Sequence, residues 1–213
     1  MSTTVRAQAP VEQLEVGAFT IPTDQPEADG TLATMGPGVP YAIAAKFAYP
    51  SRPVVAMVGD GAMQMNTMAE LITVAKYWRE WASPTWICGV FSNESLNPGT
   101  WEQRVLAGDP GIEASQRIPN VPYHRFADLI GLKGLYVDDP ELVGPAWESA
   151  LAADCPVLIE FKTDPEVPPL PPHITGKQAK AFASALAKGD PAHGHVLLET
   201  ARGVFASILA GRE

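Results

Sequence analysis

Short apolar runs alternate with helical patterns through the middle of the chain. The run Val54–Val58 stops at Gly59-Asp60-Gly61 and is followed by a helical pattern over residues 66–78 and a second strand-like run over residues 85–91. The pattern then predicts helix, strand, helix and strand over residues 123–130, 135–137, 140–153 and 157–162. This alternation is typical of the α/β class and predicts a doubly wound, mostly parallel sheet with helices on both faces.

The segments that flank this alternation predict a three-part organisation. Residues 1–29 show little periodicity and are predicted to be a poorly ordered leader or arm, and residues 30–172 are predicted to form the main domain. Residues 173–213 contain two amphipathic stretches and are predicted as a helical extension. Within the main domain, residues 97–122 are predicted to be irregular, and the proline-rich residues 164–172 are predicted to form an extended strap.

The charge and composition narrow the classes of partner. The 213 residues carry a formal net charge of −9, which argues against nucleic acid or an anionic membrane as the main partner. No apolar run is long enough to cross a bilayer, so we expect a cytoplasmic protein. An anionic ligand would therefore have to be bound by a metal ion or by backbone N–H groups rather than by a basic patch.

Two oxygen-bearing side chains follow consecutive predicted strands. Asp60 ends the first strand and Asn93 follows the second, and ligands of open α/β sheets collect beyond the carboxyl ends of strands. A carboxylate and an amide carbonyl are hard ligands that Mg²⁺ accepts, together with phosphate oxygens and water. Gly59 and Gly61 would let the backbone approach a phosphate, and the N–H groups of Gly61, Ala62 and Met63 precede the predicted helix, whose positive end favours an anion.

At these residues the chain resembles the thiamine-diphosphate enzyme superfamily, in particular the C-terminal diphosphate-binding domain of pyruvate-oxidase-like and acetolactate-synthase-like proteins. The signature reads Gly59-Asp60-Gly61-Ala62-Met63-Gln64-Met65-Asn66, and then Val90-Phe91-Ser92-Asn93-Glu94-Ser95 with Ser92 at the first position of the usual Asn-Asn pair. The resemblance implies that Mg²⁺ is bound by the Asp60 carboxylate, the Asn93 side-chain oxygen and the Ser95 backbone carbonyl. Residues 30–172 would then be the domain that binds thiamine diphosphate and Mg²⁺.

The loop Gly30–Pro40 also looks like a cofactor-binding segment of this family. By resemblance, Met35 would be the apolar wedge that holds the cofactor in its bent shape, and the Ala33 carbonyl would accept a hydrogen bond from the aminopyrimidine ring. Such a site works by positioning the cofactor more than by side-chain chemistry. No residue of the chain is therefore assigned a catalytic role.

The resemblance implies an enzyme that decarboxylates a 2-oxo acid such as pyruvate and transfers an acyl carbanion. The family's catalytic glutamate lies on a separate pyrimidine-binding domain, so we expect a partner chain or a homo-oligomer to supply it, and FAD would be present only with a further domain. Whether the chain is part of an active enzyme stays open. The alternative is a non-catalytic remnant or binding module of the same fold.

Simpler explanations exist for each residue of the predicted site. Gly-Asp-Gly is a common turn, and Asn93 could only form an Asx-turn. Met35 could fill a gap in the core. A nucleotide-binding Rossmann module is disfavoured because no Gly-x-Gly-x-x-Gly follows the first strand.

Overall fold

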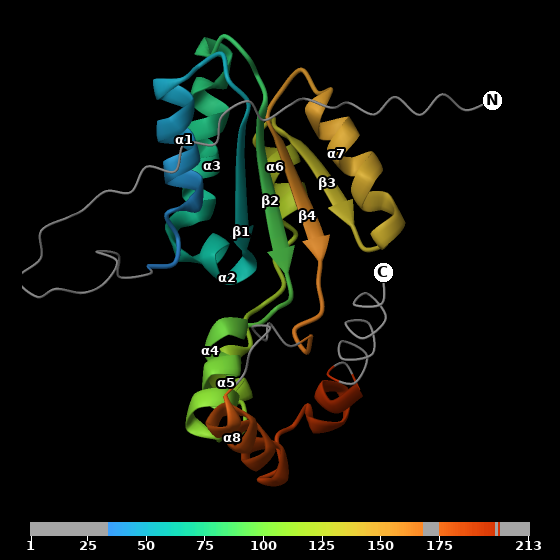
Figure 1. Ribbon diagram of the computed structural model, residues 1–213. Coiled ribbons are helices and arrows are strands. Elements are labelled where there is room, and N and C mark those ends of the chain that lie inside the picture. The colour runs from blue at the N-terminus through green and yellow to red at the C-terminus, as the bar shows by residue number, and fades with distance from the viewer. Residues whose placement is uncertain (1–33, 168–174, 199, 201–213) are drawn as a thin grey trace, which may run out of the picture. The chain divides into compact units, whose positions relative to one another are not determined.

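A parallel sheet with helices on both faces forms the body of the protein (Figure 1). The computed structural model describes residues 34–167, 175–198 and 200. Contacts divide the chain into Met1–Thr34 and Met35–Glu213, and every element named below belongs to the second unit. Both predicted domain boundaries, after residues 29 and 172, lie outside the described residues, as does most of the proline-rich segment.

The described elements follow the predicted alternation. The strands are β1 (Val54–Gly59), β2 (Trp86–Ser92), β3 (Lys133–Val137) and β4 (Val157–Lys162). The helices are α1 (Gly38–Ala48), α2 (Asp60–Ala62), α3 (Met68–Tyr77), α4 (Asn97–Glu102), α5 (Glu113–Gln116), α6 (Tyr123–Leu129), α7 (Val143–Leu151) and α8 (Gly176–Ala187). The α/β class and the parallel sheet are therefore confirmed.

The strands lie in the order β1-β2-β4-β3, and all neighbouring pairs are parallel. The two central strands, β2 and β4, are buried along nearly their whole length, which explains why their sequences read as continuous apolar runs. The edge strand β1 alternates instead, with Ala56 and Val58 buried and Val55 and Met57 exposed. Register places Gly59 opposite Phe91, so β1 and β2 end side by side.

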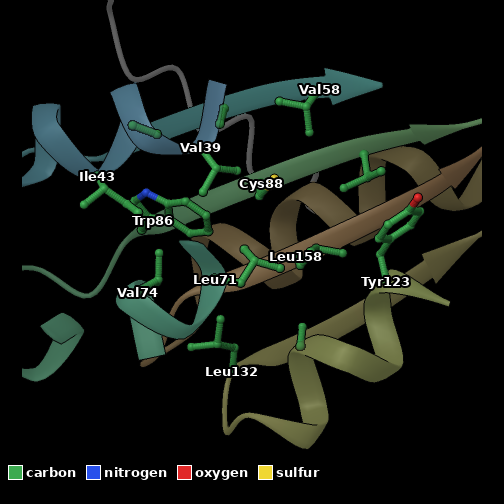
Figure 2. Packing of buried hydrophobic residues seen from close by; sticks show 14 of the residues in the cluster. Val39, Ile43, Val58, Leu71, Val74, Trp86, Cys88, Tyr123, Leu132 and Leu158 are labelled. Atoms are coloured by element: carbon green, nitrogen blue, oxygen red, sulfur yellow. The ribbon is translucent and has the colours of Figure 1, made fainter. Parts of the chain in front are cut away.

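Two apolar clusters cover the two faces of the sheet. Helices α1, α3 and α6 pack on one face around Trp86, which is fully buried, and Figure 2 shows Val39, Leu71 and Tyr123 in the same cluster. Helix α7 packs on the other face against β3 and β4. Among the described residues, no helix is both long and apolar enough to cross a membrane.

Two sequence-based expectations about local structure were wrong. The helix after β1 begins at Asp60 rather than at Asn66, and it passes through a π-helical turn, Met63–Thr67, before α3. Residues 97–122 are not irregular throughout, since they contain α4, a second π-helical turn (Gln103–Ala107) and α5. Helix α8 packs on this second turn, with Ala181 against Gly108.

Candidate functional site

The carboxylate of Asp60 joins the ends of β1 and β2. Asp60 is 3% exposed and begins α2 directly after the last residue of β1. Its Oδ2 accepts the backbone N–H groups of Asn93 at 2.9 Å and Glu94 at 2.6 Å, and its Oδ1 accepts the N–H of Gly61 at 2.9 Å. A carboxylate has about four acceptor positions. Backbone N–H groups therefore satisfy most of this capacity.

Burial raises the pKa of Asp60, while the hydrogen bonds from the Glu94, Gly61 and Asn93 N–H groups act in the opposite direction. No ion pair involves Asp60 within the described part of the chain. The charge is thus held by neutral donors alone. A cation bound to this carboxylate would favour the ionised form.

The loop after β2 holds Asn93 and Ser95 beside this carboxylate. Asn93 Oδ1 accepts the N–H of Ser95 at 2.9 Å, so the Asx-turn that the sequence left open does form. An amide oxygen has two lone pairs, and one remains for a metal ion. An isolated β-bridge between Ser95 and Arg117 also holds the loop. Glu94, which lies between Asn93 and Ser95, has a left-handed φ of 58°.

The Met35 side chain lies near Gly61, in α2, and its role as the wedge stays a prediction. A Cβ atom on Gly61 would lie 2.7 Å from Leu96 Cδ2 and 3.3 Å from Met35 Cε, so these two apolar side chains pack directly against the glycine. The Met35 loop is fixed at Gly36, whose φ is 104° and whose carbonyl accepts the Thr67 hydroxyl at 2.9 Å. Met35 itself is 43% exposed and so does not fill a gap in the core. Ala33 lies outside the described residues.

The backbone groups predicted to bind phosphate lie in the first turn of α2 rather than before a helix. The N–H of Gly61 donates to Asp60 Oδ1, and the N–H of Met63 donates to the Asp60 carbonyl. The Met63 side chain is fully buried in the core, and Gly59 lies at the exposed end of β1 with open space at its missing Cβ. Phosphate binding by Gly61, Ala62 and Met63 stays a prediction, and two of these N–H groups would have to be shared or released.

Two further residues contact the Asp60 turn and were not predicted from the sequence. The Tyr123 hydroxyl at the start of α6 donates to the Asp60 carbonyl at 3.1 Å. Gln64 Nε2 donates to Tyr123 Oη at 3.0 Å and to the Pro119 carbonyl at 2.9 Å. No sequence motif marks these residues, because the contact joins positions more than 50 residues apart.

A cavity of about 500 Å³ opens beside the loop that carries Asn93 and Ser95. Glu94 and Lys162 line it and pair with each other at 2.8 Å. Arg104 and Glu166, which also line it, are paired at 3.0 Å. Groups of three or more His, Cys, Asp or Glu residues placed to bind a metal are absent from the described residues. A metal at Asp60 would therefore use amide, backbone or ligand oxygens as its other ligands.

The comparisons with known proteins identify the family. The family described as "Thiamine pyrophosphate enzyme, C-terminal TPP binding domain" matches residues 15–161. The chain is 38% identical over 157 residues to a Bacillus subtilis protein named "Putative thiamine pyrophosphate-containing protein YdaP", covering 74% of this chain and 26% of that protein. It is 34% identical over 142 residues to the mitochondrial acetolactate synthase catalytic subunit of Aspergillus candidus, covering 67% of this chain and 19% of that subunit.

A solved structure agrees with these relatives. The thiamine diphosphate-dependent 4-hydroxybenzoylformate decarboxylase of Rhodococcus jostii RHA1 matches with a TM-score of 0.53 and 28% identity, over 61% of this chain and 23% of that one. The chain spans about a quarter or less of the length of these relatives. The family match covers the Asp60 turn, both central strands and the Asn93 loop. The chain therefore belongs to the thiamine pyrophosphate enzymes and carries their C-terminal thiamine pyrophosphate-binding domain.

Proposed function

We propose that this chain binds thiamine diphosphate together with Mg²⁺ and serves as the cofactor-holding domain of an enzyme that acts on a 2-oxo acid such as pyruvate. Its relatives include an acetolactate synthase subunit and a 4-hydroxybenzoylformate decarboxylase, and the substrate in the second name is itself a 2-oxo acid. The proposed reaction is decarboxylation followed by acyl transfer. When bound, thiamine diphosphate supplies the electron sink for this chemistry.

The observation that carries the proposal is the arrangement around Asp60. Its carboxylate is buried, is held by N–H groups at the end of β2, and has no ion pair within the described residues. Asn93 Oδ1, in the loop that follows β2, accepts one N–H group and keeps one acceptor position. These are hard oxygen donors of the kind that Mg²⁺ prefers, with phosphate oxygens and water completing its shell. The residues present thus fit the metal, and we assign Asp60, Asn93 and the Ser95 carbonyl as its ligands.

The proposed roles of the remaining residues concern binding and orientation. Gly61 lets the Leu96 and Met35 side chains pack against its backbone, and the exposed Met35 is proposed as the wedge for the cofactor rings. Gly59, Ala62 and Met63 would contribute backbone to the diphosphate site, and Ala33 would contribute a carbonyl to the aminopyrimidine. The catalytic glutamate is proposed to come from a pyrimidine-binding domain, in a second copy or in a separate chain.

Calorimetric titration with thiamine diphosphate, with and without Mg²⁺, tests the proposal. In Asp60→Asn, the amide oxygen can still accept the Asn93 and Glu94 N–H groups, whereas the NH₂ group replaces the oxygen that accepts the Gly61 N–H and removes the negative charge. We expect Mg²⁺-dependent binding by the unaltered chain and its loss in Asp60→Asn and Asn93→Ala. Removing a residue that only hydrogen-bonds to a metal ligand typically costs about 10–100-fold in metal affinity, so loss of a ligand itself should cost at least about 100-fold.

Asp138→Asn is the matched control. Asp138 is an exposed carboxylate directly after β3, at the same end of the sheet but on the opposite edge strand from β1. It should bind as the unaltered chain does. Absence of binding by a folded, unaltered chain would contradict the proposal and favour a non-catalytic module of the same fold.

A further inference from the structure

A chain of hydrogen bonds runs from the Gln64 side chain through the Tyr123 hydroxyl to the main-chain carbonyl of Asp60. Tyr123 is fully buried, and Figure 2 shows its ring in the core cluster with its hydroxyl oxygen at one end. That hydroxyl lies 3.1 Å from the Asp60 carbonyl. The carboxylate of Asp60 is tied to the loop after β2, and its carbonyl is tied to α6. Asp60 is therefore held both at its side-chain carboxylate and at its main-chain carbonyl.

The donors and acceptors of this chain have a defined direction. Gln64 Nε2 has two N–H groups, and its two contacts are the Pro119 carbonyl at 2.9 Å and Tyr123 Oη at 3.0 Å. Because the amide donates to the tyrosine oxygen, the one proton of the hydroxyl is left for the Asp60 carbonyl. A tyrosine hydroxyl ordinarily loses its proton only near pH ~10, so it is a proton donor at neutral pH.

Gln64 lies in the π-helical turn Met63–Thr67, immediately after the turn that carries Asp60. Single π-helical turns inside α-helices are found frequently at functional sites. Here the turn directs the Gln64 side chain toward both α6 and the Pro119 carbonyl that precedes it. The geometry ties the Asp60 turn to α6, independently of the bonds that Asp60 makes to β2.

We infer that Tyr123 and Gln64 are positioning residues that set the metal affinity of the Asp60 site through the main-chain carbonyl of Asp60. The inference rests on the proposed function, in which Asp60 is a Mg²⁺ ligand. Outer-shell hydrogen bonds orient metal ligands, and their removal typically weakens metal binding by about 10–100-fold. Loss of the Tyr123 hydroxyl should let the Asp60 turn rotate relative to the Asn93 loop.

The test is titration of the 213-residue chain with Mg²⁺ at saturating thiamine diphosphate. Tyr123→Phe keeps the ring in the core and removes only the hydroxyl, and we expect Mg²⁺ to bind about tenfold more weakly. Gln64→Glu has no N–H to donate, so its carboxylate would take the Tyr123 proton away from the Asp60 carbonyl; we expect a similar loss. The double variant should be no weaker than Tyr123→Phe alone, because both changes break one path.

Two controls separate positioning from a merely structural role. Tyr136→Phe removes the same hydroxyl from a 44% exposed tyrosine on β3 and should leave Mg²⁺ affinity unchanged. The affinity for thiamine diphosphate without Mg²⁺ should differ little between Tyr123→Phe and the unaltered chain, whereas the gain on adding Mg²⁺ should shrink. If Tyr123→Phe lowers the melting temperature but keeps the full Mg²⁺ gain, or if the two single losses add, the inference is wrong.

Asp60→Asn makes the two possible failures distinguishable. Loss of the Mg²⁺ gain in Asp60→Asn with no change in Tyr123→Phe would overturn the positioning role and leave the proposed function standing. A full Mg²⁺ gain in Asp60→Asn would overturn the proposed function and, with it, the inference.

Discussion

Two regions of the molecule each bury an aspartate, but they balance its charge differently. Asp190, after α8, is fully buried and receives two hydrogen bonds from Arg104, at 2.8 and 2.9 Å. Asp60 is nearly as buried, but it receives only backbone N–H groups. A buried carboxylate that already has its counterion supports the fold, whereas one held only by neutral donors can accept a cation from solution.

The pKa directions of the two carboxylates follow this difference. Burial raises the pKa of Asp60, and the hydrogen bonds that it accepts do not overcome that effect. Burial also acts to raise the pKa of Asp190, but the Arg104 guanidinium and the N–H groups of Gly111 and Ala192 outweigh it and lower the pKa. The comparison predicts that changes around Asp190 affect stability and that changes around Asp60 affect ligand binding.

The largest expected effect is a loss of stability when Arg104 is replaced. Arg104→Met leaves Asp190 buried without its cation, and removing one partner of a buried pair typically costs about 3–5 kcal/mol of unfolding free energy. Urea unfolding measures the loss, and Mg²⁺-dependent cofactor binding by the variant that remains folded should be unchanged. The matched control is Arg117→Met, because Arg117 pairs with Glu113 on the surface, where such pairs contribute about 0–1 kcal/mol. Equal losses in the two variants would contradict the comparison.

The pH dependence of stability should have opposite signs at the two aspartates. The charge of Asp190 contributes stability above its unfolded pKa of 3.8, and this contribution is lost as the pH falls through its lowered folded pKa. The burial cost of Asp60 applies above its raised pKa and disappears as the pH falls toward 3.8. On acidification, the advantage of the unaltered chain over Asp190→Asn should therefore shrink, and its stability relative to Asp60→Asn should rise. Urea unfolding over a pH series without Mg²⁺ measures both differences, and slopes of equal sign would be the contrary result.

A smaller effect is expected at Gly61, and it should separate binding from stability. An added Cβ meets the flexible ends of Leu96 and Met35, which can shift, and alanine is favoured over glycine in a helix by about 0.5–1 kcal/mol. Gly61→Ala should therefore unfold within about 1 kcal/mol of the unaltered chain. Because the new methyl group displaces the Met35 side chain, which is the proposed wedge, thiamine diphosphate should bind about tenfold more weakly, or about 1.4 kcal/mol. Calorimetry checks this, with Gly144→Ala in α7 as the control, since its Cβ would meet nothing within 4 Å.

The smallest effect is expected at Glu94, which has a left-handed φ of 58° and an ion pair with Lys162 that is partly exposed. Left-handed backbone costs a non-glycine residue about 1 kcal/mol, and an exposed ion pair contributes about 0–1 kcal/mol. Glu94→Gly removes both, whereas Glu94→Gln removes only the ion pair. Urea unfolding should find the glycine variant the more stable of the two by up to about 1 kcal/mol. A less stable glycine variant would show that the loop gains more from side-chain contacts than it loses in backbone strain.

Much of the fold could be predicted from the sequence because its signals are local. Strands β1 and β2 coincide with short apolar runs, and Asp60 is flanked by two glycines. Both signals depend only on residues that are close in the chain. The helices α4 and α5 were missed because their sequence lacks a clear apolar period. Helix α4 contacts the distant helix α8, and the ring centroids of Trp101 in α4 and Phe182 in α8 lie 6.0 Å apart. Tertiary contacts therefore stabilise a helix that local propensity alone did not predict.

The candidate site likewise contains residues that could be predicted from the sequence and residues that could not. Asp60 and Asn93 could be predicted to lie together because parallel strands that follow each other in sequence are often neighbours, and β1 and β2 are paired. Tyr123 and Gln64 could not be predicted, because nothing within either segment requires one to meet the other. The same holds for the pairing of β2 with β4 rather than with β3.

The sequence by itself determined the alternation of strands and helices, the strand-end positions of Asp60 and Asn93, and the resemblance that the family match confirmed. Each of these follows from the periodicity or spacing of residues near one another in the chain. Only the tertiary structure decided which donors surround each carboxylate. That choice separates Asp60 from Asp190, because hydrogen bonds and ion pairs between distant segments depend on how the elements pack and leave no local pattern in the sequence.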